Sequence, residues 1–368
     1  MKNILVTVYT YSLGGGAEKV LKELVNNLDK DKYKITILPF AYYGVKKEPT
    51  DENVTVLPSV VNLEKTGRLK KWLKFFSVKF FPSVIRNLYI KEKYDIEISF
   101  NYQIPSFMVK KTKNNKVINW IHTDIYDLEK SWLERKLQKR SFKQADIIVA
   151  ISENTKKSIE HIFPQYADKI KLVYNGTDID RTVSLSNEKT DIKIKDNSIV
   201  FLGRLEQRKN PLGLIEYVKS AVDDGRDLNL YILGQGEQGE QVKDLIKRYN
   251  LQDRIFLLGY INNPCPVITQ CKAVCMLSEA EGFPTVFTEG MALGVPFIST
   301  DVGGASELSY NGKCGKVVST YEQFRDAIDS VVFDREVALE MHNACLERIK
   351  DFSIPKQVET VEYMLDNF

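Results

Sequence analysis

Charged side chains suited to a phosphorylated ligand follow an apolar run at 199–202. Gly203 and Arg204 come directly after this run, and Lys209 precedes a helix predicted over 212–221. Arginine can chelate phosphate oxygens with its planar fork and lysine adds a point charge, so this turn suits a pyrophosphate. A basic turn that is merely solvated is the alternative interpretation.

Two carboxylates with seven residues between them form a second candidate site. Glu281 and Glu289 follow an apolar run at 273–277, and the turn Gly282-Phe283-Pro284 leads into a helix for which Thr285 is the expected N-cap. Glu281 then precedes the helix and Glu289 lies about one turn inside it. The positive helix N-terminus between the two acids suits a diphosphate whose flanking hydroxyl groups the carboxylates grip. Capping and solvation of these acids is the plainer alternative.

Glycines mark two further turns between a predicted strand and a predicted helix. Gly14-Gly15-Gly16 precedes a helix over 17–28, where glycine permits close backbone approach and the helix N-terminus favours an anion; a flexible turn is the alternative. Gly234-Gln235-Gly236-Glu237-Gln238-Gly239 matches the G-x-G-x-x-G pattern of dinucleotide binding. The acid expected after the next strand is missing, because 255–258 runs into Gly259-Tyr260-Ile261, so the match is weak evidence for NAD.

His122 is one of three histidines and follows an apolar run at 117–121. Site residues collect at the carboxyl ends of parallel strands, and this position makes His122 a candidate. An imidazole satisfied within its own loop is equally compatible with the sequence.

Length and composition limit the architecture that positions these residues. The chain has 368 residues, of which 43% are hydrophobic and 27% charged, with a net charge of +3. This favours two globular domains and excludes global disorder, collagen and solenoid repeats. The first apolar run is too short for a signal peptide and no stretch reaches the roughly 18 apolar residues of a membrane span, so we expect a soluble cytoplasmic protein. Five cysteines without zinc-site spacing are expected to be reduced thiols.

Short Val/Ile/Leu runs alternate with helical stretches, which is typical of parallel strands covered on both faces. The predicted strands are 4–8, 35–38, 96–99, 117–121, 147–150 and 172–174, then 199–202, 228–233, 255–258, 273–277 and 296–299. The polar segment 180–197 is predicted to be a linker between the two sets. We therefore predict an α/β protein with two Rossmann-like, doubly wound domains over 1–180 and 181–350. Ligands are expected at the carboxyl strand ends, where the domains face each other.

The segment 64–93 carries nine Lys/Arg against two Glu, interleaved with aromatic residues. Such a mixture is expected of a helix in an anionic membrane interface. The alternative is an amphipathic surface helix whose aromatic side chains enter the core. A nucleic-acid role is disfavoured because no recognised nucleic-acid-binding module accompanies the segment. The candidate acceptor or membrane residues are Lys70, Lys71, Trp72, Lys74, Phe75 and Phe76.

These motifs together resemble the retaining GT-B glycosyltransferases of family 4 (glycosyl transferases group 1), of the type that builds bacterial polysaccharide or cell-wall glycans. The resemblance spans both domains and is more specific in the second half. The segments that carry it are Gly14-Gly15-Gly16-Ala17-Glu18, Asn175-Gly176-Thr177-Asp178, Gly203-Arg204-Leu205 with Lys209, Glu281 to Glu289, and Gly303-Gly304 with Glu307.

The resemblance implies roles for residues of both domains. Domain 1–180 would bind the acceptor and 181–350 the nucleotide-sugar donor, while a helix in 351–368 would pack back on the first domain. Arg204 and Lys209 would hold the donor pyrophosphate, Glu289 the ribose, and Glu281 with the backbone of Gly282–Pro284 the transferred sugar. Thr285 begins the helix whose N-terminus faces the diphosphate. His122 would reach a hydroxyl of the donor sugar, the loop of Gly15 and Gly16 would close over the reacting centre, and Gly259, Tyr260 and Ile261 would line the base near Gly234 and Gly236.

The function that the resemblance implies is transfer of a hexose or N-acetylhexosamine from a nucleotide-sugar, preferably a UDP-sugar, to a hydroxyl of a glycan acceptor. The acceptor would be lipid-linked, or a cell-wall or capsular precursor, handled at the inner face of the membrane. No metal or other cofactor is expected, although Asp178-Ile179-Asp180 has a D-x-D spacing. The competing readings are a nucleotide-sugar epimerase and a catalytically silent GT-B subunit that binds glycan or a partner enzyme.

Overall fold

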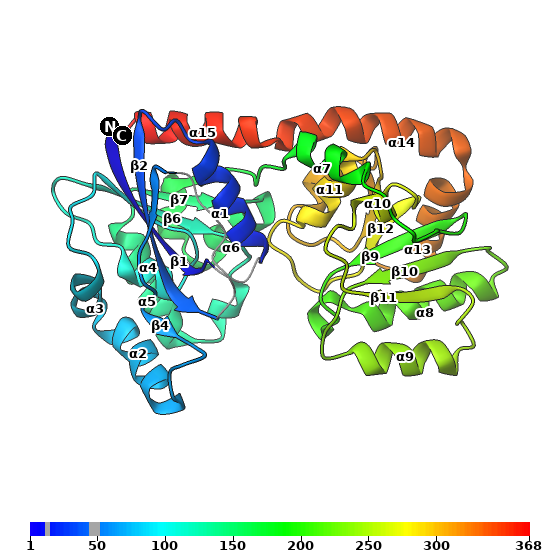
Figure 1. The fold of residues 1–368 in the computed structure, drawn as a ribbon, viewed down its shortest axis with the longest axis horizontal. Helices are drawn as coiled ribbons and strands as arrows, with labels where there is room; N and C mark the ends of the chain where they lie inside the picture. The colour runs from blue at the N-terminus through cyan, green and yellow to red at the C-terminus, as the bar shows by residue number, and fades with distance from the viewer. Residues whose placement is uncertain (12–14, 44–51) are drawn as a thin grey trace. The chain divides into compact units, whose positions relative to one another are not determined.

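The computed structural model describes residues 1–11, 15–43 and 52–368. Within these residues the chain forms two compact units: an N-terminal unit of Met1–Gly176 with Ile354–Phe368, and a C-terminal unit of Thr177–Ser353. Each unit contains a sheet of parallel strands packed with helices (Figure 1). The predicted class of two doubly wound α/β domains is confirmed.

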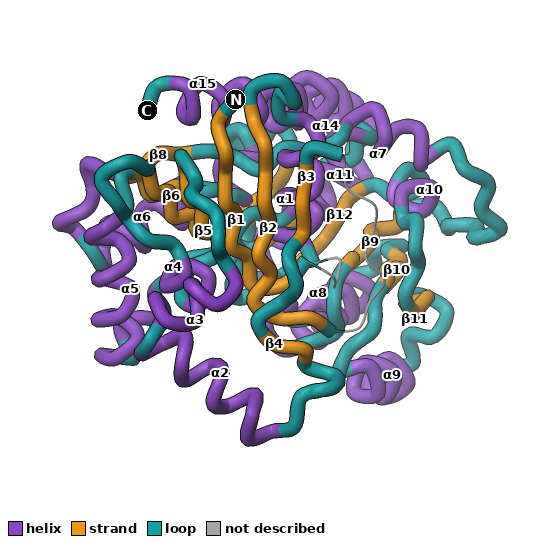
Figure 2. The backbone as a smooth tube through the Cα atoms, turned by 60° about the vertical axis from the view of Figure 1, so that its left-hand side comes forward, coloured by secondary structure: helices purple, strands orange, loops and turns teal. Residues whose placement is uncertain are grey.

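In the N-terminal unit, β1 lies at the centre of the sheet between β2 and β5. The order of the described strands is β3-β2-β1-β5-β6-β7-β8, with β4 added to β2, and their pairings are parallel. Figure 2 shows β1, β2 and β3 side by side. The strands are β1 (Lys2–Thr10), β2 (Tyr33–Tyr42), β3 (Val54–Val56), β4 (Val61–Asn62), β5 (Ile96–Ser99), β6 (Lys116–Ile121), β7 (Ile147–Ala150) and β8 (Ile170–Leu172).

Alternate residues of these strands face opposite layers of helices, as the pleat requires. Ile4 and Val6 line a small internal space together with side chains of α1 and α15, whereas Leu5 belongs to a cluster with residues of α2, α3 and α4. The helices of this unit are α1 (Gly16–Asn27), α2 (Arg68–Phe80), α3 (Pro82–Tyr89), α4 (Ile104–Met108), α5 (Trp132–Gln144), α6 (Glu153–Ile162) and α15 (Ile354–Asp366), with 3-10 turns at Tyr126–Glu129 and Pro164–Lys169.

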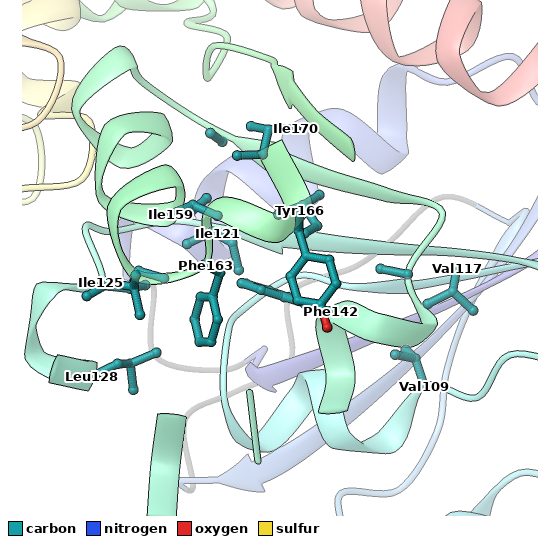
Figure 3. Close-up of a cluster of buried hydrophobic side chains, with 14 residues drawn as sticks. Val109, Val117, Ile121, Ile125, Leu128, Phe142, Ile159, Phe163, Tyr166 and Ile170 are labelled. Atoms are coloured by element: carbon teal, nitrogen blue, oxygen red, sulfur yellow. The ribbon is translucent and has the colours of Figure 1, made fainter. Parts of the chain in front are cut away.

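A cluster of buried apolar side chains fixes α5 and α6 against β6, β7 and β8 (Figure 3). Phe142 of α5 meets Phe163 edge-on, with ring centroids 5.1 Å apart. Val117 and Ile121 of β6 come from alternate positions and therefore point into the same cluster. This packing holds the carboxyl end of β6, and with it the loop that begins at His122.

In the C-terminal unit the strand order is β11-β10-β9-β12-β13-β14, and the pairings are again parallel. Figure 1 shows α8 and α9 on one side of this sheet and α10 and α11 on the other. The strands are β9 (Ser198–Leu202), β10 (Asn229–Leu233), β11 (Ile255–Gly259), β12 (Ala273–Met276), β13 (Phe297–Ser299) and β14 (Gly315–Val317). The helices are α7 (Ile179–Ser186), α8 (Pro211–Asp223), α9 (Gly239–Arg248), α10 (Cys265–Ile268), α11 (Thr285–Ala292), α12 (Ala305–Ser309), α13 (Tyr321–Ile328) and α14 (Arg335–Arg348), with 3-10 turns at Gln207–Lys209 and Ile349–Phe352 and a π-helical turn at Asp329–Phe333.

The predicted linker at 180–197 is wrong in its first part, because α7 occupies Ile179–Ser186. Asp178 caps this helix by accepting a hydrogen bond from the Arg181 N–H at 2.9 Å. The buried Thr182 donates its hydroxyl to the Asp178 carbonyl at 2.7 Å. A short polar helix of this kind gives little periodic signal, so its cap and its packing against α10 and α11 decide the structure.

The helix α15 belongs to the N-terminal unit although the 177 residues of the C-terminal unit precede it. Val361 and Leu365 line the same internal space as Ile4. Polar contacts add to this packing: the Tyr33 hydroxyl donates to Asp366 Oδ1 at 2.6 Å, and Lys2 Nζ donates to the Leu365 carbonyl at 2.7 Å.

Candidate active site

The candidate donor residues lie at the carboxyl ends of adjacent strands in the C-terminal unit. The loop after β9 holds Arg204 and Lys209, and the loop after β12 holds Glu281. Because β9 and β12 are hydrogen-bonded neighbours, these two loops leave the same edge of the sheet side by side. The sheet order therefore explains why side chains more than 70 residues apart in sequence meet.

Lys209 and Glu281 form the central ion pair of this site, with 2.5 Å between Lys209 Nζ and Glu281 Oε1. Their side chains are 20% and 12% exposed, so the pair is largely shielded from solvent yet reachable. A charge-assisted hydrogen bond of this length fixes both side chains. The arrangement places an ammonium donor and a carboxylate acceptor at one point, which suits a ligand carrying both phosphate and hydroxyl groups.

Backbone contacts hold the two loops together around this pair. The Glu279 N–H donates to the Arg208 carbonyl at 2.8 Å, and Arg208 Nε donates to the Ala280 carbonyl at 3.1 Å. Asn210, in the left-handed region at φ 50°, caps α8 by accepting from the Gly213 N–H at 3.1 Å. Lys209 thus lies between Arg208, which forms hydrogen bonds to the other loop, and Asn210, which caps α8.

Arg204 stands apart from the Lys209–Glu281 pair. Its side chain is 77% exposed and forms an ion pair with Glu206, with 3.1 Å between Nη1 and Oε2. The structure thus places Arg204 on the predicted loop but does not bring its guanidinium to Glu281.

The glycines at 234 and 236 allow the loop after β10 to pack against the loop after β9. A Cβ on Gly234 would lie 1.8 Å from the Gly203 carbonyl oxygen, and one on Gly236 would lie 2.4 Å from the Leu205 oxygen. Leu205 closes the contact by donating its N–H to the Gln235 carbonyl at 3.0 Å and accepting from Gln238 at 2.9 Å. The G-x-G-x-x-G match therefore has a packing explanation within the unit.

The loop 281–284 is packed against the loop after β13. Gly303, at φ 54°, lies so close that a Cβ there would be 2.5 Å from the Gly282 oxygen, and a Cβ on Gly304 would be 2.6 Å from the Phe283 ring. The N-cap of α11 is Pro284 rather than Thr285, and no side chain caps it, so the expected cap at Thr285 is wrong. Thr285 is the first residue of α11, and the half-buried Glu289 follows in its second turn.

Ser278 is a further polar residue at this edge of the sheet that sequence reasoning missed. It is buried, and its hydroxyl has no hydrogen-bond partner among the residues that the structure describes. Its carbonyl accepts from the Thr300 hydroxyl at 2.5 Å, which ties the ends of β12 and β13 together. A lone serine after an apolar run carries no signal that could have identified it.

Tyr260 and Ile261 follow β11, which is the outermost strand on one side of the sheet. The strands β10 and β9 lie between β11 and β12. The Tyr260 side chain is 71% exposed and Ile261 is partly exposed.

His122 lies at the carboxyl end of β6 in the N-terminal unit. Its ring contacts Phe100 with centroids 4.3 Å apart, and its Nε2 is buried without a partner among the described residues. Burial lowers the pKa of His122 to about 3, so the imidazole is neutral at physiological pH. A neutral imidazole can offer one donor and one acceptor nitrogen to a hydroxyl group.

Gly15 and Gly16 belong to the same unit and begin α1, Gly15 as the N-cap and Gly16 as the first residue. A Cβ at either position would meet no atom of the described residues within 4 Å, so packing against these residues does not require glycine there. The predicted Gly14 lies outside the described residues.

The basic segment divides into core-facing and exposed side chains. Phe75 packs edge-on against Phe40, with centroids 4.8 Å apart, and the Lys74 ammonium donates to the Val60 carbonyl. Trp72 and Phe76 stack on each other in the exposed part of α2, with centroids 5.4 Å apart. Lys70 is exposed and Lys71 partly so. The aromatic side chains of α2 thus lie on two faces of the helix, one packed against the core and one exposed.

Across the described ranges, no helix combines the length and apolarity that crossing a bilayer requires.

Two family models match the chain, one in each half. Residues 14–181 match the model described as Glycosyltransferase Family 4, and residues 184–350 match Glycosyl transferases group 1. The matches therefore cover most of both units and all the candidate donor residues.

The chain is similar to curated glycosyltransferases along most of its length. An uncharacterized glycosyltransferase of Methanocaldococcus jannaschii is 27% identical over 72% of this chain and 76% of its own. The N-acetylgalactosamine-N,N'-diacetylbacillosaminyl-diphospho-undecaprenol 4-alpha-N-acetylgalactosaminyltransferase of Campylobacter jejuni is 28% identical over 84% of this chain and 85% of its own.

Solved structures show the same fold. HepE of Anabaena, crystallised in complex with UDP, has a TM-score of 0.73 at 17% identity and covers 100% of both chains. The same neighbour has also been solved in complex with UDP-glucose. The fold and both family models lead to one conclusion: the chain belongs to the group 1, family 4 glycosyltransferases and has their GT-B fold.

Proposed function

We propose that the protein transfers a hexose or N-acetylhexosamine from a UDP-sugar to a hydroxyl of a lipid-linked glycan, with retention of anomeric configuration. The observation that carries the proposal is the Lys209–Glu281 pair at 2.5 Å, on neighbouring loops at the carboxyl ends of β9 and β12. The Campylobacter relative, whose name gives an undecaprenol-linked acceptor, supports the choice of acceptor class.

In the proposed reaction, cationic groups stabilise the departing nucleoside diphosphate. Lys209 and Arg204 supply positive charge, and the N–H groups at the start of α11 add their dipole. Glu281 accepts hydrogen bonds from the hydroxyls of the transferred sugar while its partner Lys209 holds it in place. The donor bond breaks, the acceptor hydroxyl attacks from the same face, and its proton passes to a phosphate oxygen of the leaving group. No protein nucleophile is required.

The neutral His122 is proposed to orient a sugar hydroxyl rather than to move a proton. Since burial lowers its pKa to about 3, its protonated form is scarce at neutral pH. We also propose that no metal is required, because the N–H groups at the start of α11 and the donor groups of Lys209 and Arg204 would stabilise the diphosphate. Turnover is then unchanged by EDTA; loss of turnover that Mg²⁺ restores would contradict this.

Contact with the membrane is proposed through the exposed part of α2, at the cytoplasmic face. Trp72, Phe76 and Phe80 form a continuous set of exposed rings, with 4.5 Å between the centroids of the last two. The ribbon and the backbone tube both place α2 at the periphery of its unit (Figures 1 and 2). An enzyme so docked can reach an acceptor headgroup without spanning the bilayer.

The deciding experiment is a donor screen. Purified protein is incubated with single UDP-, GDP- and other nucleotide-sugars, with and without lipid extract, and release of nucleoside diphosphate is measured. We expect release with one UDP-sugar that depends on the extract. Silence with all donors despite UDP binding, even with extract present, would favour a catalytically silent subunit, and an altered sugar without transfer would favour an epimerase.

Glu281→Gln isolates the role of the carboxylate in the same assay. Its shape is retained and its charge is lost, so we expect kcat to fall roughly 100-fold or more while the Kd for UDP changes by less than about threefold. Glu279→Gln, an exposed acid on the same loop, is the matched control. Unchanged turnover in Glu281→Gln would remove this residue from the site.

A further inference from the structure

A basic cavity of about 50 Å³ lies among α3, α5, the end of α2 and the segment after α4 in the N-terminal unit. This volume holds a few water molecules or one small anion. Its cationic lining residues are Lys79, Arg86, Lys110 and Arg140. None of the described residues that line it belongs to the candidate active site.

Two of the four cations are neutralised by carboxylates. The buried Glu97 accepts from Arg86 Nη2 and from the Lys110 N–H, the latter at 2.8 Å. Glu134 accepts from Lys79 Nζ at 3.0 Å. These ion pairs hold the walls of the cavity in place. Because each cation is paired with a carboxylate, the pairs add no net positive charge to the cavity.

The other two cations supply the excess. The Lys110 and Arg140 side chains form no ion pair with the residues that the structure describes. Both are exposed, as is Ser83, so the cavity opens to solvent. Two uncompensated cations and a serine hydroxyl around so small a space are complementary to a phosphate group.

The surroundings of the cavity indicate where that phosphate comes from. Pro82, Ser83 and Arg86 of α3 line the cavity, whereas Val84 and Leu88 of the same helix are exposed. Phe80 and Phe81, next to Lys79 in sequence, are also exposed apolar residues. Val84 and Leu88 thus lie on a different face of α3 from the side chains that line the cavity. A basic pocket and exposed apolar side chains on one helix together match a lipid, which carries both phosphate and hydrocarbon.

We propose that this cavity binds the phosphate of an anionic phospholipid headgroup, with the acyl chains lying over the exposed side chains of α3. The inference rests on the membrane docking proposed above and adds a specific lipid site to it. The lipid is a docking ligand here and not the glycosyl acceptor.

The test measures lipid binding without donor or acceptor, so it is independent of transferase activity. Dihexanoyl phosphatidylglycerol, kept below its micelle concentration, is titrated into the full chain by calorimetry. We expect saturable binding of one lipid per chain. The variant Lys110→Gln/Arg140→Gln is expected to bind at least tenfold more weakly, because it loses two charge-assisted hydrogen bonds. The matched control, Lys139→Gln/Lys143→Gln, removes equal charge from exposed positions of α5 that do not line the cavity and is expected to stay within about twofold.

Three results would overturn the proposal: no saturable binding by the native chain, equal weakening in both double variants, or binding of inorganic phosphate as tight as that of the lipid. The last result would identify a site for free phosphate. Vesicles of phosphatidylcholine with and without phosphatidylglycerol complete the test. Binding that depends on phosphatidylglycerol in the control but not in Lys110→Gln/Arg140→Gln supports the site, and identical dependence in both contradicts it. A silent donor screen beside positive lipid binding would reject the proposed transferase reaction and leave the lipid site standing.

Discussion

His122 couples the stability of the N-terminal unit to pH. Burial lowers its pKa in the folded chain to about 3, below the usual histidine value of 6.5. Between these values the unfolded chain binds a proton that the folded chain excludes, so the free energy of unfolding decreases as the pH falls. From pH 7 to pH 5 we expect His122 to account for a loss of about 2 kcal/mol.

Urea denaturation at the two pH values, for the native chain and His122→Gln, measures this contribution. The variant keeps all other titrating groups, so it should lose about 2 kcal/mol less than the native chain over this interval. The same pH dependence in both proteins would show that the imidazole is not buried in its neutral form.

Gly236 allows the loops after β9 and β10 to pack closely because it carries no side chain. Gly236→Ala brings a methyl group within 2.4 to 2.7 Å of Leu205 backbone atoms, and backbone cannot yield as a flexible side chain does. We expect the loop of Arg204 and Lys209 to shift and UDP affinity to fall at least tenfold. Isothermal titration with UDP measures this.

Gly239→Ala is the matched control, because its Cβ would lie 3.9 Å from the nearest atom, a Leu205 methyl carbon, which is ordinary contact. It should bind UDP as the native chain does. Equal affinities for the Gly236 and Gly239 variants would show that the contact between the two loops does not position the donor site.

At the scale of elements, substitutions in α2 can distinguish an effect on stability from an effect on membrane docking, because different aromatic rings of this helix are buried and exposed. The triple change Trp72→Ser/Phe76→Ser/Phe80→Ser removes exposed rings that make few core contacts. We expect loss of binding to phosphatidylglycerol vesicles in a flotation assay and a Tm within about 2 °C of the native value, since surface changes cost little.

Phe75→Ser provides the opposite control. Its ring is half-buried against Phe40, so we expect a lower Tm by roughly 4 °C or more with vesicle binding retained below that temperature. Retained flotation of the triple variant would mean that α2 does not carry the docking surface.

Elements whose pattern is local were predictable from the sequence, and those decided by distant partners were not. The apolar runs predicted the strands. Lys209 and Glu281 were two separate candidates in the residue pattern, and only the family resemblance assigned both to the donor site, where they form an ion pair. The ion pair of Arg204 with Glu206 and the cap of α7 at Asp178 are contacts that leave no periodic signal in the sequence. Phe75 packs against Phe40 and is half-buried, whereas Phe76 is exposed. Composition does not show which of the two rings contacts Phe40.

At the scale of the whole molecule, we expect the N-terminal unit to require α15 for its stability. Deleting 354–368 removes the buried Ile354, Val361 and Leu365 from the N-terminal unit. At about 1.5–3 kcal/mol for each buried side chain, the loss is comparable to the total stability of a typical domain. We expect the N-terminal unit to unfold while the C-terminal unit keeps its transition.

Differential scanning calorimetry of the truncated chain, with UDP added to identify the transition of the C-terminal unit, distinguishes the unfolding of one unit from that of the other. One remaining transition that UDP shifts upward is the expected outcome. A chain that keeps two native transitions would show that α15 is dispensable.

The place of α15 also sets the order in which the molecule can be completed during translation. Residues 354–368 are made only after the whole of Thr177–Ser353, so all of the C-terminal unit is synthesised before the N-terminal unit can close. Until then the apolar surface of α1 and of strands β1 and β2 that α15 covers stays open to nascent-chain chaperones and proteases. The half that begins synthesis is therefore the last to mature, and slowing elongation through the second half prolongs that exposure.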